Sequence, residues 1–118
     1  MALVMYGIRN CDTVKKARAW LDAAGVAYEF HDFKAKGAEA AAVSRWVAAL
    51  GWEVVLNRAG TTFRGLPEAE RTGLDAGRAV ALMVAQPAMV KRPVIEGVHA
   101  GQPILMVGFK GYADVFGG

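Results

Sequence analysis

Apolar positions in the first 32 residues change from continuous runs to helical spacing and back, which predicts a strand, a helix and a second strand. An apolar run over residues 3–7 ends in glycine, as short strands often do. A helix is predicted to begin at the capping residues within 9–13 and to run to about Ala24, because Gly25 follows it and its apolar residues lie on one face. Aromatic and β-branched residues over 26–32 predict the second strand. Two strands joined by one helix within so short a segment are expected to be parallel.

The rest of the chain is predicted to form a helical block, a hairpin and a last helix. The expected elements are a loop at 34–37, a helix over 38–50, a short helix and then a turn over 54–66, a helix over 74–86, an antiparallel hairpin of 93–98 and 103–108, and a short helix over 111–116. Gly51 ends the first of these helices, while Asp75 caps the long one and Pro87 stops it. This order, βαβ, helices, ββα, is the thioredoxin plan with a helical insertion at about 38–88. We therefore predict one α/β, thioredoxin-like domain over residues 1–118.

Composition and charge narrow the function classes. With 118 residues, 54% hydrophobic and 21% charged, the chain is long enough and apolar enough for one small core. The chain has a single cysteine, which excludes an intramolecular disulfide framework. Its two histidines, His31 and His99, are far apart in the sequence, which argues against a zinc site. No apolar stretch is long enough to span a bilayer, and the N-terminus lacks the pattern of a signal peptide. The 14 lysines and arginines are scattered rather than gathered in a basic stripe, which makes a nucleic-acid partner unexpected. We expect a cytoplasmic, soluble monomer without metal or membrane contact.

Cys11 is the candidate nucleophile, because it stands between a predicted strand and the start of a helix. A thiol with a pKa near ~8.5 is only ~3% thiolate at neutral pH. Lowering that pKa by ~2 units requires roughly 2.7 kcal/mol, of which a helix N-terminus supplies about 0.3–1 kcal/mol. Nearby cations must supply the rest, and Arg9, Lys15 and Lys16 are the nearest in sequence. The alternative is an inert, half-buried cysteine.

Two other segments carry candidate chemistry. Asn57-Arg58 and Thr61-Thr62-Phe63-Arg64 form a predicted polar, basic turn, whose hydroxyl and guanidinium groups suit an oxyanion, although a capping turn with a solvated arginine would look the same. Arg92-Pro93 opens the hairpin. In a thioredoxin plan the proline here is commonly cis and faces the cysteine, so we predict a cis Arg92–Pro93 bond with Arg92 in the Cys11 cleft. The alternative is an ordinary trans proline at the start of an edge strand. The chain has no Cys-x5-Arg loop starting at Cys11, no Cys-x-x-Cys and no glycine-rich phosphate loop.

The segments YGIRNCDTVKKA at 6–17, LNRAGTTFRGL at 56–66 and KRPV at 91–94 closely resemble a known family. It is the glutaredoxin-coupled arsenate reductase (ArsC) family, in its short YffB-like branch, which is related to the Spx-type transcription regulators. The resemblance covers essentially the whole chain. It implies a thioredoxin-like fold with a helical insertion.

The resemblance also implies a reaction. In these reductases one cysteine attacks arsenate, glutathione attacks the adduct, and glutaredoxin resolves it, while three arginines hold the oxyanion. The cysteine corresponds to Cys11 and two of the arginines to Arg58 and Arg92, whereas the stretch 104–110 offers only Lys110 in place of the third. We therefore expect a glutathione-dependent thiol oxidoreductase with glutathione as co-substrate, no tightly bound cofactor and glutaredoxin as a candidate partner. The expected glutathione-binding or substrate-binding residues are Arg9, Asn10, Asp12, Thr13, Lys15, Thr61, Thr62, Arg64 and Pro93. The alternatives are a true arsenate reductase and an Spx-like, non-catalytic regulator that binds RNA polymerase.

Overall fold

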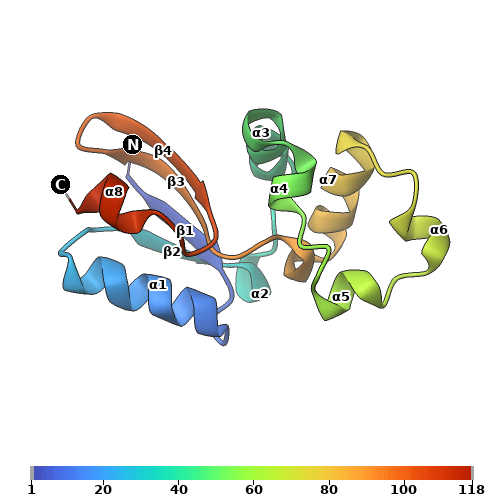
Figure 1. Ribbon diagram of the computed structural model, residues 1–118, viewed down its shortest axis with the longest axis horizontal. Coiled ribbons are helices and arrows are strands. Elements are labelled where there is room, and N and C mark those ends of the chain that lie inside the picture. Colours follow the sequence, from blue (N-terminus) through green and yellow to red (C-terminus); the bar gives the residue numbers. More distant parts are fainter. Residues whose placement is uncertain (1, 118) are drawn as a thin grey trace. The chain divides into compact units, whose positions relative to one another are not determined.

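The computed structural model describes residues 2–117, which form two compact units (Figure 1). The first unit combines both ends of the chain, up to Phe33 and again from Arg92 onward. The second unit is the intervening segment Lys34–Lys91. The first unit contains all the named strands of the described chain, and the second is built from helices.

A four-stranded mixed sheet organises the first unit. Its elements are β1 (Val4–Gly7), α1 (Asp12–Ala23), β2 (Glu29–Asp32), β3 (Val94–His99), β4 (Gln102–Val107) and α8 (Tyr112–Phe116). The strand order is β2-β1-β3-β4, with β1 and β2 parallel and the β1–β3 and β3–β4 pairs antiparallel. The predicted parallel pair, the hairpin and the α/β fold of the thioredoxin type are confirmed.

One face of this sheet carries the core of the first unit. Met5 of β1 pairs with Phe30 on one side and with Ile95 on the other, so that all three side chains share a face. Helices α1 and α8 pack against this face. The fully or largely buried residues of this core are Leu3, Met5, Val14, Ala17, Leu21, Val26, Ile95, Tyr112 and Phe116. Burial of one such large side chain stabilises the fold by about 1.5–3 kcal/mol, so the helical stripe seen in the sequence is what holds α1 on the sheet.

The second unit packs two longer helices together with several single turns. Its elements are α2 (Phe33–Lys36, beginning at the last residue of the first unit), α3 (Ala40–Leu50), α4 (Trp52–Val55), α5 (Thr61–Arg64), α6 (Glu68–Arg71), α7 (Ala76–Ala85) and the 3-10 turn η1 (Pro87–Met89). The apolar stripe of α3, which includes the fully buried Trp46, lies against α7, which buries Met83. A bridge between Leu56 and Val90 joins the two ends of the α5–α7 segment.

Several predictions about local structure were wrong. Residues 34–36 of the expected loop belong to the one-turn helix α2, which Gly37 follows with φ +70°; lysine and alanine are good helix formers, but one turn is too short to show a helical period. The second strand begins at Glu29 rather than Val26, because the N–H of Val26 is used to close α1 on the carbonyl of Leu21. The segment 54–66 contains parts of two short helices, α4 and α5, and the helix α6 was not predicted.

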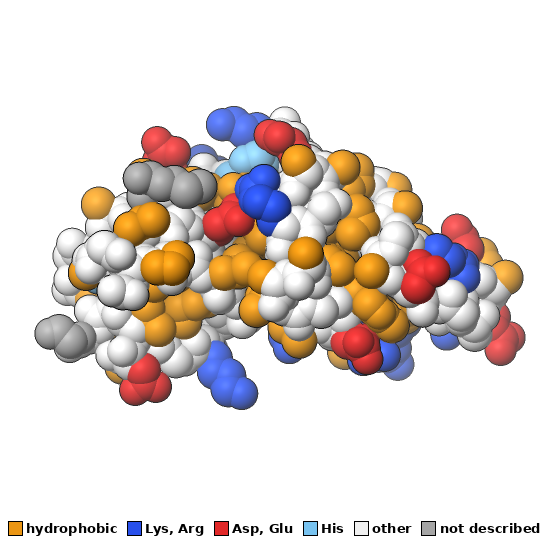
Figure 2. Space-filling view, turned by 90° about the horizontal axis from the view of Figure 1, so that it is seen from above, with side chains coloured by type: hydrophobic (Ala, Val, Ile, Leu, Met, Phe, Trp, Pro, Cys, Tyr) orange, Lys and Arg blue, Asp and Glu red, His pale blue; other side chains and the backbone are white. Residues whose placement is uncertain are grey.

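The surface is mixed in charge. On the face shown in Figure 2, lysine and arginine side chains alternate with acidic and apolar ones rather than forming one stripe. None of the helices within residues 2–117 has both the length and the hydrophobicity that crossing a membrane requires.

Candidate active site

Cys11 is the N-cap residue of α1. Its backbone is extended, with φ −135° and ψ 124°, and its carbonyl accepts the first hydrogen bond of the helix from the N–H of Lys15 at 2.9 Å. The side chain is half-buried and packs against the core of the first unit. This position leaves the thiol at the end of a helix where backbone N–H groups lack partners within the helix.

The surroundings of Cys11 favour a thiolate. Burial on its own would raise the pKa of the thiol, because it penalises the charged form. Four effects act in the other direction and lower the pKa below its ordinary value: the N–H of Val14, a hydrogen bond from the Arg92 side chain, the positive charge of Arg92, and the N–H of Thr13. The thiol makes no capping hydrogen bond of ordinary geometry, so these N–H groups act by stabilising negative charge on the sulfur. Cys11 is therefore poised for nucleophilic chemistry.

The cation that acts on Cys11 is Arg92 rather than the flanking basic residues. Arg9 is turned toward β2, where its Nε lies 3.5 Å from Oδ2 of Asp32 and its guanidinium lies 5.4 Å from the ring centre of Phe30. Lys15 donates a long hydrogen bond, 3.5 Å, to Oδ1 of Asn10. The interpretation that sequence neighbours lower the pKa of Cys11 was wrong in this respect, because each of these two side chains is directed to another partner.

Arg92 reaches Cys11 from the segment that precedes β3. The Arg92–Pro93 peptide bond is cis, which confirms the prediction. Pro93 is fully buried, and its carbonyl accepts a hydrogen bond from the N–H of Gly108 at 2.8 Å. Since β3 pairs with β1 through Val94 and Tyr6, the residue before Pro93 arrives beside the loop that follows β1. The predicted placement of Arg92 in the Cys11 cleft agrees with this contact.

The remaining predicted site residues fall into two groups. Asn10, Asp12 and Thr13 are exposed around the start of α1, next to Cys11 in the chain, and their binding roles stay predictions. The second group belongs to the second unit and consists of Arg58, Thr61, Thr62 and Arg64. Arg58 is exposed with its guanidinium 5.4 Å from the ring of Trp52. The expected turn at Thr61-Thr62-Phe63-Arg64 is instead the helix α5, in which Phe63 is buried. The binding roles assigned to this group stay predictions.

The sequence model of the ArsC family matches residues 6–111. The chain belongs to the ArsC family. A protein of Haemophilus influenzae, named only as uncharacterized, is 32% identical over 114 residues, which cover 97% of this chain and 98% of the relative.

Solved structures similar to this ArsC family member include a protein named YFFB (PA3664), at 53% identity, with a TM-score of 0.89 and coverage of 97% of this chain and 98% of that one. An arsenate reductase (ArsC) related protein from Brucella melitensis is 52% identical, with a TM-score of 0.73 over 98% of this chain and 95% of that one. A possible arsenate reductase from Streptococcus mutans is 25% identical, with a TM-score of 0.78 over 98% of each chain.

Sequence reasoning missed one residue that positions the site in this ArsC chain. A Cβ atom added to Gly7, the last residue of β1, would lie 2.9 Å from Cγ2 of Val14 and 3.7 Å from Cε1 of Phe30. Only a glycine lets α1 approach the strand this closely without a shift, and Val14 contributes one of the N–H groups that act on Cys11. A glycine that ends a strand just before a helix was the available signal.

Proposed function

We propose that this protein is a glutathione-dependent thiol oxidoreductase in which the thiolate of Cys11 is the nucleophile. The observation that carries the proposal is the lowered pKa of Cys11 at the start of α1, with the Arg92 side chain hydrogen-bonded to it. Membership of the ArsC family supports a thiol oxidoreductase of the arsenate reductase type. Thiolate character is the property that both nucleophilic attack and thiol–disulfide exchange require.

The reaction we propose has two exchanges. The Cys11 thiolate attacks the glutathione sulfur of a mixed disulfide, forms a Cys11–glutathione disulfide and releases the substrate thiolate. A second glutathione thiolate then attacks the glutathione sulfur of that disulfide, which yields glutathione disulfide and regenerates the Cys11 thiolate. The net reaction is that one glutathione thiol and the mixed disulfide give the substrate thiol and glutathione disulfide. Two electrons pass from the attacking glutathione thiolate to the substrate sulfur, and the substrate thiolate takes up the proton that this glutathione released to solvent.

Arg92 and the N-terminus of α1 stabilise the leaving Cys11 thiolate in the second exchange, because the charge that develops there is the one they stabilise in the resting protein. We propose that the glutathione carboxylates are bound by exposed cations near this helix start, with Lys15 and Arg9 as candidates, and that Asn10, Asp12, Thr13 and Pro93 shape the approach. Glutathione-binding roles for Arg58, Thr61, Thr62 and Arg64 rest on the chemistry of their side chains and, for Arg58, on the family resemblance.

The test has two stages. The rate of alkylation by iodoacetamide is measured against pH, and an apparent pKa of about 8.5 or higher would contradict the nucleophile assignment. Reduction of a glutathionylated peptide is then followed through the glutathione disulfide released. We expect Cys11→Ser to abolish turnover and Arg92→Gln to reduce it. Arg71→Gln, which removes an exposed arginine of α6, is the matched control and should leave the rate unchanged.

Roles for the second unit are tested in the same assay. If Arg58 holds glutathione, Arg58→Ala raises KM for glutathione while the alkylation pKa of Cys11 stays unchanged. An unchanged KM would remove Arg58 from the proposed site.

Arsenate reduction is the second candidate, favoured by the family match and by solved relatives described as arsenate reductase-related. We expect it to be slow, because the stretch 104–110 has no arginine to complete the set of three. Each charge-assisted hydrogen bond to an oxyanion contributes about 1.5–3 kcal/mol, so the loss corresponds to about one to two orders of magnitude in rate. Efficient turnover of arsenate with glutathione and glutaredoxin would overturn this expectation. A non-catalytic regulator, as the resemblance to Spx-type proteins would allow, has no need of a thiolate at neutral pH.

A further inference from the structure

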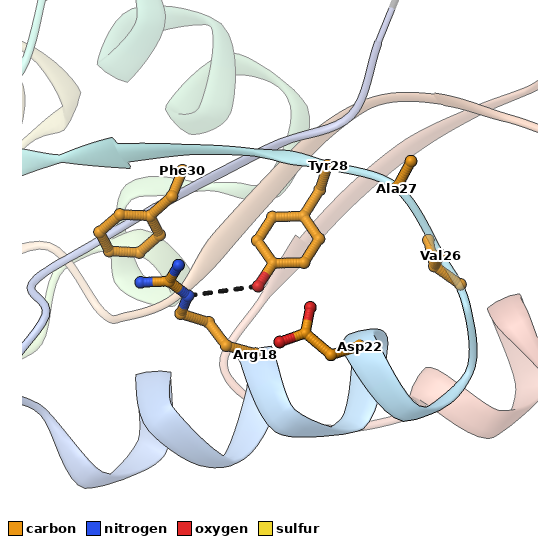
Figure 3. Close-up of a pocket in the computed structure, with 6 residues that line it drawn as sticks. All are labelled: Arg18, Asp22, Val26, Ala27, Tyr28 and Phe30. Atoms are coloured by element: carbon orange, nitrogen blue, oxygen red, sulfur yellow. Dashed lines mark hydrogen bonds between the residues drawn. The ribbon is translucent and has the colours of Figure 1, made fainter.

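A groove of about 340 Å³ lies between α1 and β2 in the first unit, away from Cys11 (Figure 3). Its lining residues come from one helix, one strand and the segment that joins them: Arg18, Asp22, Val26, Ala27, Tyr28 and Phe30. Arg18 lies seven positions beyond Cys11 in α1, which corresponds to about 10 Å along the helix axis. The groove is therefore separate from the thiol, although it shares a helix with it.

Arg18 is held in place by two side chains from the strand side of the groove. Its guanidinium lies 4.2 Å from the ring centre of Phe30, and its Nε donates a hydrogen bond of 3.2 Å to the hydroxyl of Tyr28. Within residues 2–117, the two terminal nitrogens of Arg18 have no hydrogen-bond or ion-pair partner. A guanidinium fixed in this way presents two parallel N–H donors, and an anion that binds them does not have to order a flexible side chain first.

Arg9 differs from Arg18 although it lies near the same ring. Its guanidinium is 5.4 Å from the ring centre of Phe30, and its Nε is already engaged with the carboxylate of Asp32. Arg9 is thus paired with a carboxylate through its Nε, whereas Arg18 makes no ion pair within residues 2–117.

Asp22 provides an opposite charge in the same groove. It follows Arg18 by four positions in α1, a spacing at which an arginine and an aspartate commonly form an ion pair. No ion pair joins the two in the described chain, since Arg18 is turned toward Tyr28 and Phe30. Figure 3 shows the guanidinium and the carboxylate on the two sides of the Tyr28 hydroxyl. The groove is thus lined by a cation and an anion that form no ion pair with each other and lie four positions apart in α1.

We propose that this groove binds a small zwitterionic α-amino acid. Its carboxylate receives the two free N–H donors of Arg18, and its ammonium group faces the carboxylate of Asp22. Val26, Ala27 and the ring of Tyr28 supply an apolar wall for a short aliphatic side chain. The volume lies at the small end of the range for ligand sites, which suits a molecule of this size.

Three probes of nearly equal size separate the two charges of the ligand. L-Alanine carries both, propionate lacks the ammonium group, and ethylamine lacks the carboxylate. Each is titrated into the ¹⁵N-labelled full chain, and backbone amide shifts give the affinity and the location. We expect L-alanine to perturb amides of residues 18–30 and to bind about 1.5-fold to fivefold more tightly than propionate, which is the range for an exposed ion pair. Ethylamine should bind most weakly, because the pre-ordered Arg18 fork contributes most.

Matched variants then assign the groups. Arg18→Gln should weaken L-alanine binding at least about tenfold, since charge-assisted hydrogen bonds are lost. Asp22→Asn removes the negative charge proposed to face the ammonium group of the ligand, so L-alanine and propionate should bind to this variant with the same affinity. Lys16→Gln removes an exposed charge from the same helix outside the groove, and Cys11→Ser removes the thiol; both should leave L-alanine binding unchanged.

The proposal is overturned if L-alanine and propionate bind equally to the unaltered protein, if the shifts map outside the groove, or if Lys16→Gln weakens binding as much as Arg18→Gln. Because Cys11→Ser abolishes the proposed thiol chemistry and leaves this site intact, failure of one proposal does not imply failure of the other.

Discussion

Replacement of Gly7 by alanine tests how closely the sheet and helix α1 must approach. The added Cβ would lie 2.9 Å from Cγ2 of Val14, whereas carbon atoms prefer about 3.5–4.0 Å. Val14 is fully buried, and its β-branched side chain has little rotational freedom, so the first turn of α1 must shift by roughly 0.6–1 Å. Overpacking of this kind costs about 1–3 kcal/mol, while loss of glycine's freedom in the unfolded chain returns about 0.5–1 kcal/mol.

The net destabilisation expected for Gly7→Ala is about 0–2.5 kcal/mol, or a fall in Tm of up to about 10 °C. Urea and thermal unfolding, followed by tryptophan fluorescence, measure it. The same shift moves the N–H of Val14 away from the sulfur, so the pKa of Cys11 should rise toward its ordinary value and the alkylation profile should move to higher pH. Gly77→Ala is the control: its Cβ would make only an ordinary contact, 3.6 Å from Oδ1 of Asp75, and it should stabilise the protein.

A double-mutant cycle isolates the contact. Val14→Ala removes the methyl groups that collide with the new Cβ but keeps the N–H that acts on Cys11. The double variant Gly7→Ala/Val14→Ala should therefore be more stable than the sum of the single effects implies, and its alkylation profile should return toward that of the unaltered protein. Additivity within about 0.3–0.5 kcal/mol would refute the reasoning.

Three further predictions follow from the same geometry. Arg92→Gln removes the positive charge and the hydrogen-bonding side chain next to Cys11, so the pKa of the thiol should rise, with Arg92→Lys intermediate, as read from alkylation rates against pH. Because the pKa of Cys11 is lowered in the folded protein, ionisation of this thiol stabilises the fold. This contribution is complete above the unfolded pKa of ~8.5 and is lost as the pH falls through the folded pKa. Between these two pKa values, the unfolding free energy of the protein minus that of Cys11→Ser should rise with pH, and a difference that does not change with pH would contradict the prediction. Gly97→Ala places a Cβ into the backbone of Ala2 at φ +145°, so unfolding experiments should show a loss of about 3 kcal/mol or more, and a neutral effect would show that β1 and β3 can separate locally at little cost.

Local patterns in the sequence predicted much of the fold. Val14, Ala17 and Leu21 specified α1 and the face that it buries, because apolar residues at this spacing lie on one side of a helix, and that side packs against the sheet. Gly25 and Asp75 marked ends of helices because turn and cap conformations depend on the residue itself and its immediate neighbours. Errors occurred where single-turn helices carry too few residues for a period to be recognised, as at α2 and α6.

In the candidate site, too, local features could be predicted from neighbouring residues in the sequence, and contacts between distant segments could not. Cys11 could be identified from sequence, because its place before a helix is a local property. Nearness in the chain suggested the wrong cations, since Arg9 and Lys15 are directed to Asp32 and Asn10. Arg92 could be predicted for the Cys11 cleft only through the expected thioredoxin plan, not from its own sequence neighbours. Arg92 acts instead, and it is brought to Cys11 only when β3 pairs with β1. Electrostatic stabilisation depends on distance and orientation in space, so the sequence determined which residue is the candidate nucleophile, and the tertiary structure decided which groups lower the pKa of its thiol.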